Sequence, residues 1–460
     1  DQPRSRGLGD VYKRQNNSIS LSGSVTGATG GTPGIKTINI NAAGSGGVTV
    51  GGIVSDGDVS TPLKIVKTGA GQLNLSTVTH TFTGGVSIEE GILTISSGGS
   101  ANSSSISLGA AGNTGSIVRI AVVNSSTNPS SPITVVDQTS GTATTRVLGT
   151  NSSTSGQWSG PITLNEDLTV STATAGGFTL QSGATVNLNS STLSLVNSSA
   201  TSAINVRAVG KISGSGNVVV SNTSTGNPTV GLVILEGADH DYTGTTTISA
   251  GTLQIGNGAA TGSIASTSSI SNSGVLDYKR TGTLNQGGPI SGSGSVRLIG
   301  SATVTFDKAN TYSGATSIGN GGKLTVATGG SIAPTTGAAL NVGFNGGAGT
   351  LQYDSSATSK FGGIIVGNGT NNVGTLNQTK GTINATSLIL SSAFSAGNGN
   401  VSIGNNSGDT AALNITGSAT ISASSSGAIS TLTVKNTGTI AIGGSSVSYT
   451  HLRAHETEAD

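Results

Sequence analysis

The chain alternates aliphatic and polar residues in short runs, each bounded by Gly, Asn or Ser. Strict alternation over a few residues is typical of short β-strands with one buried face. Nothing recurs at the i, i+3, i+4 spacing of an amphipathic helix. The pattern therefore predicts an all-β chain of short strands, which suits a solenoid better than a large sandwich. The clearest aliphatic pairs are Leu73 and Leu75, Val86 and Ile88, Leu93 and Ile95, Val186 and Leu188, Leu193 and Leu195, and Leu253 and Ile255.

A two-part motif recurs along the chain. Its first part has the form Gly-x-Gly followed by alternating aliphatic residues, and its second part begins at an aromatic residue followed by Thr or Ser and then Gly. Glycine at these corners allows a sharp turn between two strands. The first part spans residues 69–75, 214–220 and 292–298, and the second spans 82–95, 242–255 and 312–326.

These segments resemble the passenger-associated transport repeat, also called the autotransporter-associated β-strand repeat. The resemblance implies a secreted or surface-exposed parallel β-helix of a Gram-negative bacterium. We predict an all-β fold, a single right-handed parallel β-helix (β-solenoid) over residues 16–445, with repeats near 63–95, 232–258 and 292–326. The copies are unevenly spaced, which predicts degenerate coils between them.

The two ends differ from the rest of the chain. Residues 1–15 concentrate basic side chains, and residues 446–460 hold two of the four His. Both stretches resemble translated adaptor sequence at the ends of assembled environmental (metagenomic) fragments, so we expect them to be non-native and exclude them from the fold prediction.

The composition narrows the classes of function. The 460 residues include 74 Gly, 33% hydrophobic and only 8% charged residues, with no Cys and a net charge of +1. This balance gives no electrostatic basis for binding nucleic acid or anionic lipid. The modest hydrophobic content is enough for a narrow solenoid interior with Ser, Thr and Asn outside, at about 20 to 25 residues per coil.

Two histidines occupy one repeat position. His80 and His240 lie two residues before the repeat's aromatic residue, where the third copy has Asn310. A polar structural role at a turn explains the three residues better than catalysis does. The aromatic residues Phe82, Tyr242 and Tyr312 share the next repeat position, and we expect them to pack structurally.

Other candidates for chemistry are weak. The segments 56–58 and 239–241 each hold two Asp, and without further oxygen ligands we interpret them as solvated turns rather than metal sites. We expect Glu89-Glu90 to point to solvent from a corner, Lys279-Arg280 to form no nucleic-acid patch, and Trp158 to cap the interior rather than to stack on a sugar. Gly-rich stretches lack the Gly-Lys-Ser/Thr ending of a phosphate loop. We assign no catalytic, cofactor-binding or metal-ligating residues and no cofactor.

Three classes of function remain. We predict a non-enzymatic, extracellular structural or adhesive stalk, the passenger of an autotransporter-like protein at the outer-membrane surface. The alternatives are a glycan-degrading β-helix enzyme, which needs acidic residues clustered on adjacent coils, and a glycan-binding module. Host or matrix glycans or other surface proteins are the expected partners, nucleic acid is not, and membrane contact is expected only through a C-terminal barrel or anchor outside this stretch.

Overall fold

The computed structural model describes residues 18–449, with internal gaps. The gaps are 28, 31, 44–45, 76–77, 97–103, 114–116, 124–127, 142–143, 151–153, 173–174, 200–204, 223–231, 238, 333–336, 345, 370–371, 391–396, 405–407, 422–429 and 444–446. Two compact units divide the chain, Asp1–Gly244 and Thr245–Asp460. The described residues contain strands and no helix, as predicted. In the same residues there is accordingly no helix long and apolar enough to cross a bilayer.

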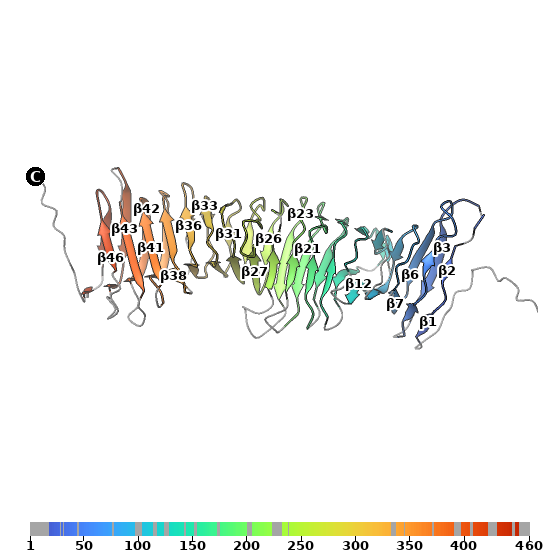
Figure 1. Cartoon of the computed structure of the whole chain (residues 1–460). Coiled ribbons are helices and arrows are strands. Elements are labelled where there is room, and N and C mark those ends of the chain that lie inside the picture. Colours follow the sequence, from blue (N-terminus) through green and yellow to red (C-terminus); the bar gives the residue numbers. More distant parts are fainter. Residues whose placement is uncertain are drawn as a thin grey trace, which may run out of the picture. The chain divides into compact units, whose positions relative to one another are not determined.

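Unit 1 contains three larger sheets of parallel strands, and within each sheet the strands follow one another along the unit (Figure 1). The first sheet is formed by β1 (Ile19–Leu21), β4 (Val48–Val50), β7 (Gln72–Leu75), β9 (Gly91–Ser96), β12 (Ile117–Val123), β15 (Thr145–Gly149), β18 (Leu168–Ser171), β21 (Leu193–Asn197) and β24 (Val218–Asn222). The second is formed by β3 (Lys36–Asn41), β6 (Leu63–Thr68), β8 (Val86–Ile88), β10 (Ile106–Leu108), β13 (Ile133–Val135), β17 (Ile162–Leu164), β20 (Val186–Asn187) and β23 (Ile212–Ser213). The third is formed by β16 (Gly156–Trp158), β19 (Phe178–Leu180), β22 (Val206–Ala208) and β25 (Leu232–Leu235). Two short parallel pairs are β2 (Val25–Thr26) with β5 (Val54–Ser55), and β11 (Gly112–Asn113) with β14 (Ser140–Gly141).

Unit 2 is built in the same way. One sheet comprises β26 (Thr246–Ile248), β28 (Ile270–Asn272) and β31 (Ile290–Ser291). A second comprises β27 (Thr252–Ile255), β29 (Val275–Tyr278), β32 (Ser295–Leu298), β35 (Thr316–Gly319), β38 (Leu340–Phe344), β40 (Thr358–Val366), β42 (Lys380–Leu390), β44 (Thr410–Ile415) and β47 (Thr439–Ile442), with β45 (Ala419–Ile421) between β42 and β48 (Val447–Tyr449). A third comprises β30 (Thr283–Gln286), β33 (Thr303–Phe306), β36 (Gly322–Val326), β39 (Gly349–Tyr353), β41 (Val373–Gln378), β43 (Asn398–Ile403) and β46 (Thr431–Val434), and β34 (Ala309–Asn310) pairs with β37 (Ser331–Ile332).

Consecutive strands step from sheet to sheet, and each circuit returns to the next parallel position. In unit 1, for example, β17, β18 and β19 contribute to the second, first and third sheets. Each circuit is one coil of a β-solenoid, so the predicted fold class is confirmed. Partner residues in adjacent coils lie from 20 positions apart, as for Leu73 and Leu93, to 31 positions apart, as for Val401 and Leu432. The coil length predicted from the sequence was therefore too short for many coils, because long corner loops separate short strands.

The core is a set of apolar, mostly aliphatic columns that run through the interior of each unit. Alternate residues are buried along many of the strands, as Leu63 and Ile65 in β6 illustrate. Stacking identical inward positions keeps apolar side chains in contact while backbone hydrogen bonds join the coils. One column in unit 1 is Val48, Leu73, Leu93, Ile120, Leu148, Val170, Leu195 and Val220, and one in unit 2 is Ile255, Tyr278, Leu298, Ile318, Val342, Val366 and Leu390.

Polar side chains form matching ladders between coils. Asn414 Nδ2 donates to Asn384 Oδ1 at 3.0 Å, and these two residues are in register. Gln181 Nε2 donates to Gln157 Oε1 at 2.6 Å, although the register pairs Gln157 with Thr179. Each side-chain amide carries both donors and an acceptor, so like residues on adjacent coils can pair. The predictions that residues 1–15 and 446–460 are non-native concern the two ends of the chain. These residues lie outside the described part, except for the strand Val447–Tyr449.

Candidate functional site

The repeat position of His80, His240 and Asn310 is a buried hydrogen-bond acceptor. All three side chains are buried. Each accepts a hydrogen bond from a backbone N–H of the preceding coil: Val54 N–H to His80 Nδ1 (3.1 Å), Ile212 N–H to His240 Nδ1 (3.2 Å) and Ile290 N–H to Asn310 Oδ1 (2.9 Å). The shared structural role predicted from the sequence is confirmed.

The two histidines are held neutral. A ring nitrogen that accepts from an N–H must be unprotonated. Burial lowers the pKa of His240 to about 4, although Asp239 and Asp241 act against the shift, and burial lowers the pKa of His80 as well. His80 and His240 are therefore structural acceptors at neutral pH, and their burial keeps them from acting as acid–base groups on a substrate.

The repeat's aromatic residue and the glycine two residues after it are also structural. The aromatic residues are fully buried, as expected, and they are Phe82, Tyr242 and Tyr312. Tyr312 Oη and Thr316 Oγ1 share a hydrogen bond of 2.6 Å. Two residues after each aromatic, a Cβ would overlap backbone atoms of the preceding coil, which explains Gly84, Gly244 and Gly314. Close backbone approach rather than a left-handed turn requires glycine at these positions.

The acidic turn 56–58 holds neighbouring backbone groups. Asp56 Oδ1 accepts from Leu63 N–H at 2.6 Å, and its Oδ2 accepts from Thr83 N–H at 3.0 Å. Asp58 Oδ1 accepts from the hydroxyl and N–H of Ser60. The Ser60 hydroxyl, followed by the N–H of Gly30, is the main cause that lowers the pKa of Asp58 to about 2. The carboxylates thus serve as turn caps.

The second acidic turn, 239–241, is also structural. Asp241 forms a 2.6 Å ion pair with Lys211. Within the described residues there is no group of three or more His, Cys, Asp or Glu side chains arranged to hold a metal ion.

The other residues considered from the sequence differ in how far they are buried. Glu89 and Glu90, at the corner between β8 and β9, are partly exposed. Arg280 is buried and donates to the carbonyl of Gly262 at 2.5 Å, whereas Lys279 is exposed. Trp158 is fully buried, which agrees with an interior role and is inconsistent with stacking on a sugar.

Sequence reasoning missed a buried lysine. Lys67 Nζ donates to the carbonyls of Thr68 (2.9 Å), Gly69 (2.5 Å) and Glu90 (3.0 Å). Burial lowers the pKa of Lys67 to about 8, and the charge of Glu90 acts against this shift. The alternation of Leu63, Ile65 and Lys67 was a usable signal, because it places the lysine on the inward face.

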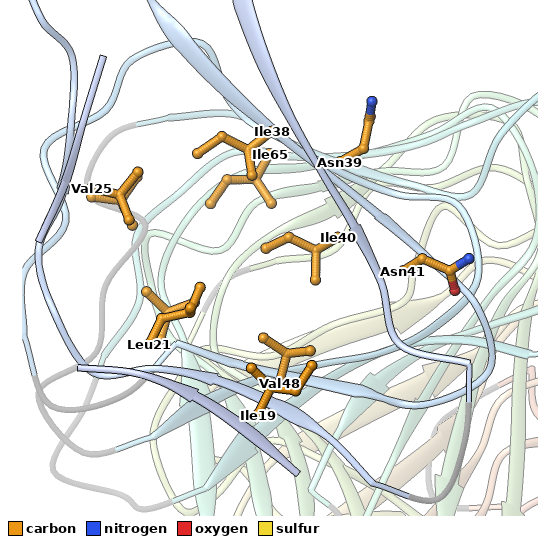
Figure 2. Close-up of a pocket in the computed structure, with 11 residues that line it drawn as sticks. Ile19, Leu21, Val25, Ile38, Asn39, Ile40, Asn41, Val48 and Ile65 are labelled. Carbon is orange, nitrogen blue, oxygen red and sulfur yellow. The ribbon is translucent and has the colours of Figure 1, made fainter. Parts of the chain in front are cut away.

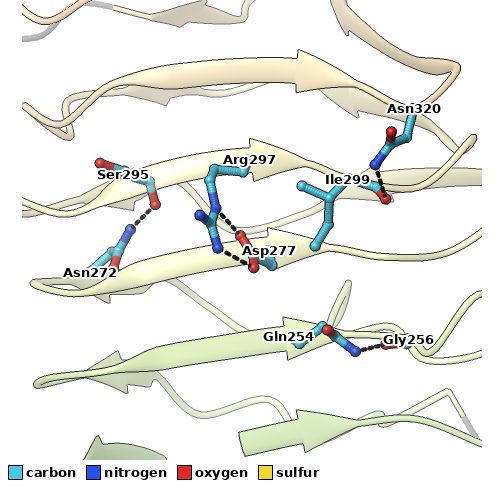
Figure 3. Close-up of polar contacts among 8 residues, drawn as sticks. All are labelled: Gln254, Gly256, Asn272, Asp277, Ser295, Arg297, Ile299 and Asn320. Atoms are coloured by element: carbon cyan, nitrogen blue, oxygen red, sulfur yellow. Dashed lines mark hydrogen bonds and ion pairs between the residues drawn. The ribbon is translucent and has the colours of Figure 1, made fainter. Parts of the chain in front are cut away.

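An ion pair between a partly exposed arginine and a buried carboxylate in unit 2 was missed as well. Arg297 Nε and Nη2 donate to the two carboxylate oxygens of Asp277 at 2.7 and 2.6 Å across β29 and β32 (Figure 3). The hydrogen bonds that Arg297 donates to Asp277 raise the pKa of Arg297. A pair of this kind can be predicted from the sequence only when the number of residues per coil is known. Because the coils differ in length, the sequence did not reveal that Asp277 and Arg297 are partners.

An apolar cavity of about 270 Å³ lies among the first described coils of unit 1. Figure 2 shows Ile38, Ile40 and Ile65 directed into the space, while Asn39 and Asn41 point away from it. The lining is an extension of the aliphatic interior and carries no group for chemistry.

The stacked parallel sheets and the recurring glycine corner define a β-solenoid with a repeated unit. The family model for the passenger-associated transport repeat matches residues 65–95, 213–255 and 298–326, which confirms the resemblance found in the sequence. A 55-residue stretch is 54% identical to the adhesin BmaC autotransporter of Brucella suis biovar 1 (strain 1330). That stretch is 12% of this chain and 2% of the Brucella protein. No solved structure matches the chain.

Proposed function

We propose that the chain is an extracellular, non-catalytic stalk of an autotransporter-like surface protein of a Gram-negative bacterium, with a role in adhesion. The observation that carries this proposal is the presence of three passenger-associated transport repeats. The partial similarity to a protein named as an adhesin supports the adhesive role.

The physical organisation is consistent with a stalk. Each coil contacts mainly its neighbours, so stability is a sum of local terms and the length of the array can vary without loss of folding. The carboxylates considered as possible metal ligands, Asp56, Asp58 and Asp241, are occupied by backbone groups, hydroxyls or Lys211. This use of charge favours a structural role over hydrolysis.

The test is surface display. The full chain is placed between a secretion signal and an autotransporter translocator in a Gram-negative host, and whole cells are probed with an antibody and an external protease. We expect surface-exposed chain and increased attachment to surfaces coated with matrix proteins or glycans. A matched strain displays an unrelated β-solenoid of similar length.

Retention of the chain in the periplasm would contradict the passenger role. Attachment no greater than that of the matched strain would contradict the adhesive role. Release of reducing ends from polysaccharides by the purified chain would contradict the non-catalytic assignment and favour a glycan-degrading enzyme.

A further inference from the structure

The third sheet of unit 2 carries a regular array of side chains on its outward face. Its strands β30, β33, β36, β39, β41, β43 and β46 pair in parallel with no register shift, and they lie side by side along the unit (Figure 1). Each strand directs two residues outward, and the aliphatic residue between them points inward. Stacking in register therefore arranges the outward residues in two rows that run across the strands.

Both rows consist mainly of threonine. The first row is formed by Thr283, Thr303, Thr350, Thr375 and Thr431, with Lys323 and Asn400 at its two other positions. The second row is formed by Thr305, Thr325, Ser402 and Thr433, with the amides Asn285, Gln352 and Asn377. None of these side chains is buried, and only that of Lys323 is charged. The face is thus a nearly neutral array of hydroxyl and amide groups.

The hydroxyls in the middle of this array are available to an external partner. Among the described residues no hydrogen bond is made by the hydroxyls of Thr303, Thr305, Thr325, Thr350 and Thr375. The second sheet of unit 2 differs, because its outward residues pair with one another: Arg297 donates to Asp277, and Asn341 Nδ2 donates to Ser317 Oγ at 3.3 Å. The third sheet therefore presents free hydroxyls, each of which both donates and accepts a hydrogen bond.

The spacing of these hydroxyls repeats in two directions. Adjacent strands lie about 4.8 Å apart, and residues two positions apart along a strand lie about 6.6 Å apart. Water oxygens on the prism face of ice repeat at comparable distances in two perpendicular directions, and each of them also donates and accepts. A rigid array of this kind places many hydroxyls at lattice positions at the same time.

Other classes of partner fit this face less well. A soluble ligand needs a concave site that buries most of its surface, whereas the array lies on an open sheet face. The two rows hold no aromatic ring that could lie against a sugar. One lysine gives no electrostatic basis for holding a charged polymer or an ionic mineral.

We propose that the outward face of the third sheet of unit 2 binds the surface of ice. Its use for attachment of a cell to ice rests on the proposed surface function. Binding of ice by the purified chain depends only on the array.

The experiment grows ice slowly from a solution of the purified full chain and measures the ratio of chain concentration in the ice to that in the liquid, with an inert globular protein of similar mass as reference. The test variant combines Thr350→Tyr with Thr375→Tyr, two neighbours in register in the first row. The control combines Thr134→Tyr with Thr163→Tyr, which are also in register on adjacent coils but lie in unit 1, where β13 and β17 have one outward residue each. Tyrosine is favoured in strands, so circular dichroism should show both variants folded.

We expect the wild type and the control to be enriched in ice, and the test variant to be enriched no more than the reference protein. Lys323→Thr replaces the one charge in the two rows and should raise the enrichment above that of the wild type; this variant decides the question if the tyrosine variant does not fold.

Four results would each overturn the proposal: no enrichment of the wild type, equal enrichment of the test variant and the wild type, an equal loss in the control, or no gain with Lys323→Thr. Retention on crystalline cellulose or chitin without enrichment in ice would replace ice by a crystalline polysaccharide. A chain that reaches the cell surface yet is not enriched in ice overturns this proposal alone and leaves the passenger role standing.

Discussion

Replacing both histidines of the repeat by asparagine should reduce the sensitivity of the fold to acid. The third copy already uses Asn310 at this position, where its Oδ1 accepts the Ile290 N–H at 2.9 Å. The variant His80→Asn with His240→Asn therefore keeps an acceptor for each backbone N–H and removes two titratable groups. At neutral pH we expect its stability to be close to that of the wild type.

The magnitude follows from proton linkage. The folded chain keeps His240 neutral down to a pKa of about 4, whereas the unfolded chain takes up a proton near the ordinary value of 6.5. Between these values the unfolded state binds more protons, so stability rises with pH. The contribution is complete above about pH 6.5 and is lost as the pH falls to about 4, which at 1.36 kcal/mol per pKa unit is about 3 kcal/mol. The pKa of His80 is lowered in the same direction.

The assay is thermal unfolding followed by circular dichroism at a series of pH values from neutral to about pH 4. The wild type should lose thermal stability over this range, and the double asparagine variant should lose clearly less. A single variant, His240→Leu, serves as the control for the hydrogen bond, because it leaves the buried Ile212 N–H without an acceptor and should cost about 1–3 kcal/mol at every pH. Equal pH dependence of the wild type and the double asparagine variant would refute the assignment of neutral, buried histidines.

Three further substitutions, one of them with a control, test the packing and the buried charges. Gly244→Val should destabilise unit 1 strongly, because the added atoms overlap the preceding coil. The control Gly23→Ala should be nearly neutral, because nothing lies within 4 Å of a Cβ at that position, and thermal melts compare the two variants. Arg297→Ala should cost about 3–5 kcal/mol in denaturant unfolding, because it leaves the buried carboxylate of Asp277 unpaired; a loss below 1 kcal/mol would contradict the pairing. Lys67→Met should cost about 1–3 kcal/mol through the loss of donors to three carbonyls, and unchanged hydrogen exchange at this corner would argue against the contacts.

The sequence by itself determined the fold class and the repeated unit. Alternating aliphatic residues such as Leu73 and Leu75 predict short strands because side chains on a strand point to opposite faces. The shared position of His80 and Asn310 predicted a common structural role, since a side-chain oxygen and an imidazole nitrogen can accept the same hydrogen bond. These are local properties, which depend on a few neighbouring residues.

Only the tertiary structure decided which residues meet across coils. Coil length varies with the corner loops, so the partner of a given residue cannot be counted from the sequence. The ion pair of Asp277 with Arg297 depends on this register. A charged residue on the inward face, such as Lys67, is visible as an exception to the alternation, but its acceptors come from the next coil as well as its own. Contacts between residues 20 or more positions apart are therefore a property of the stacked solenoid rather than of any single strand.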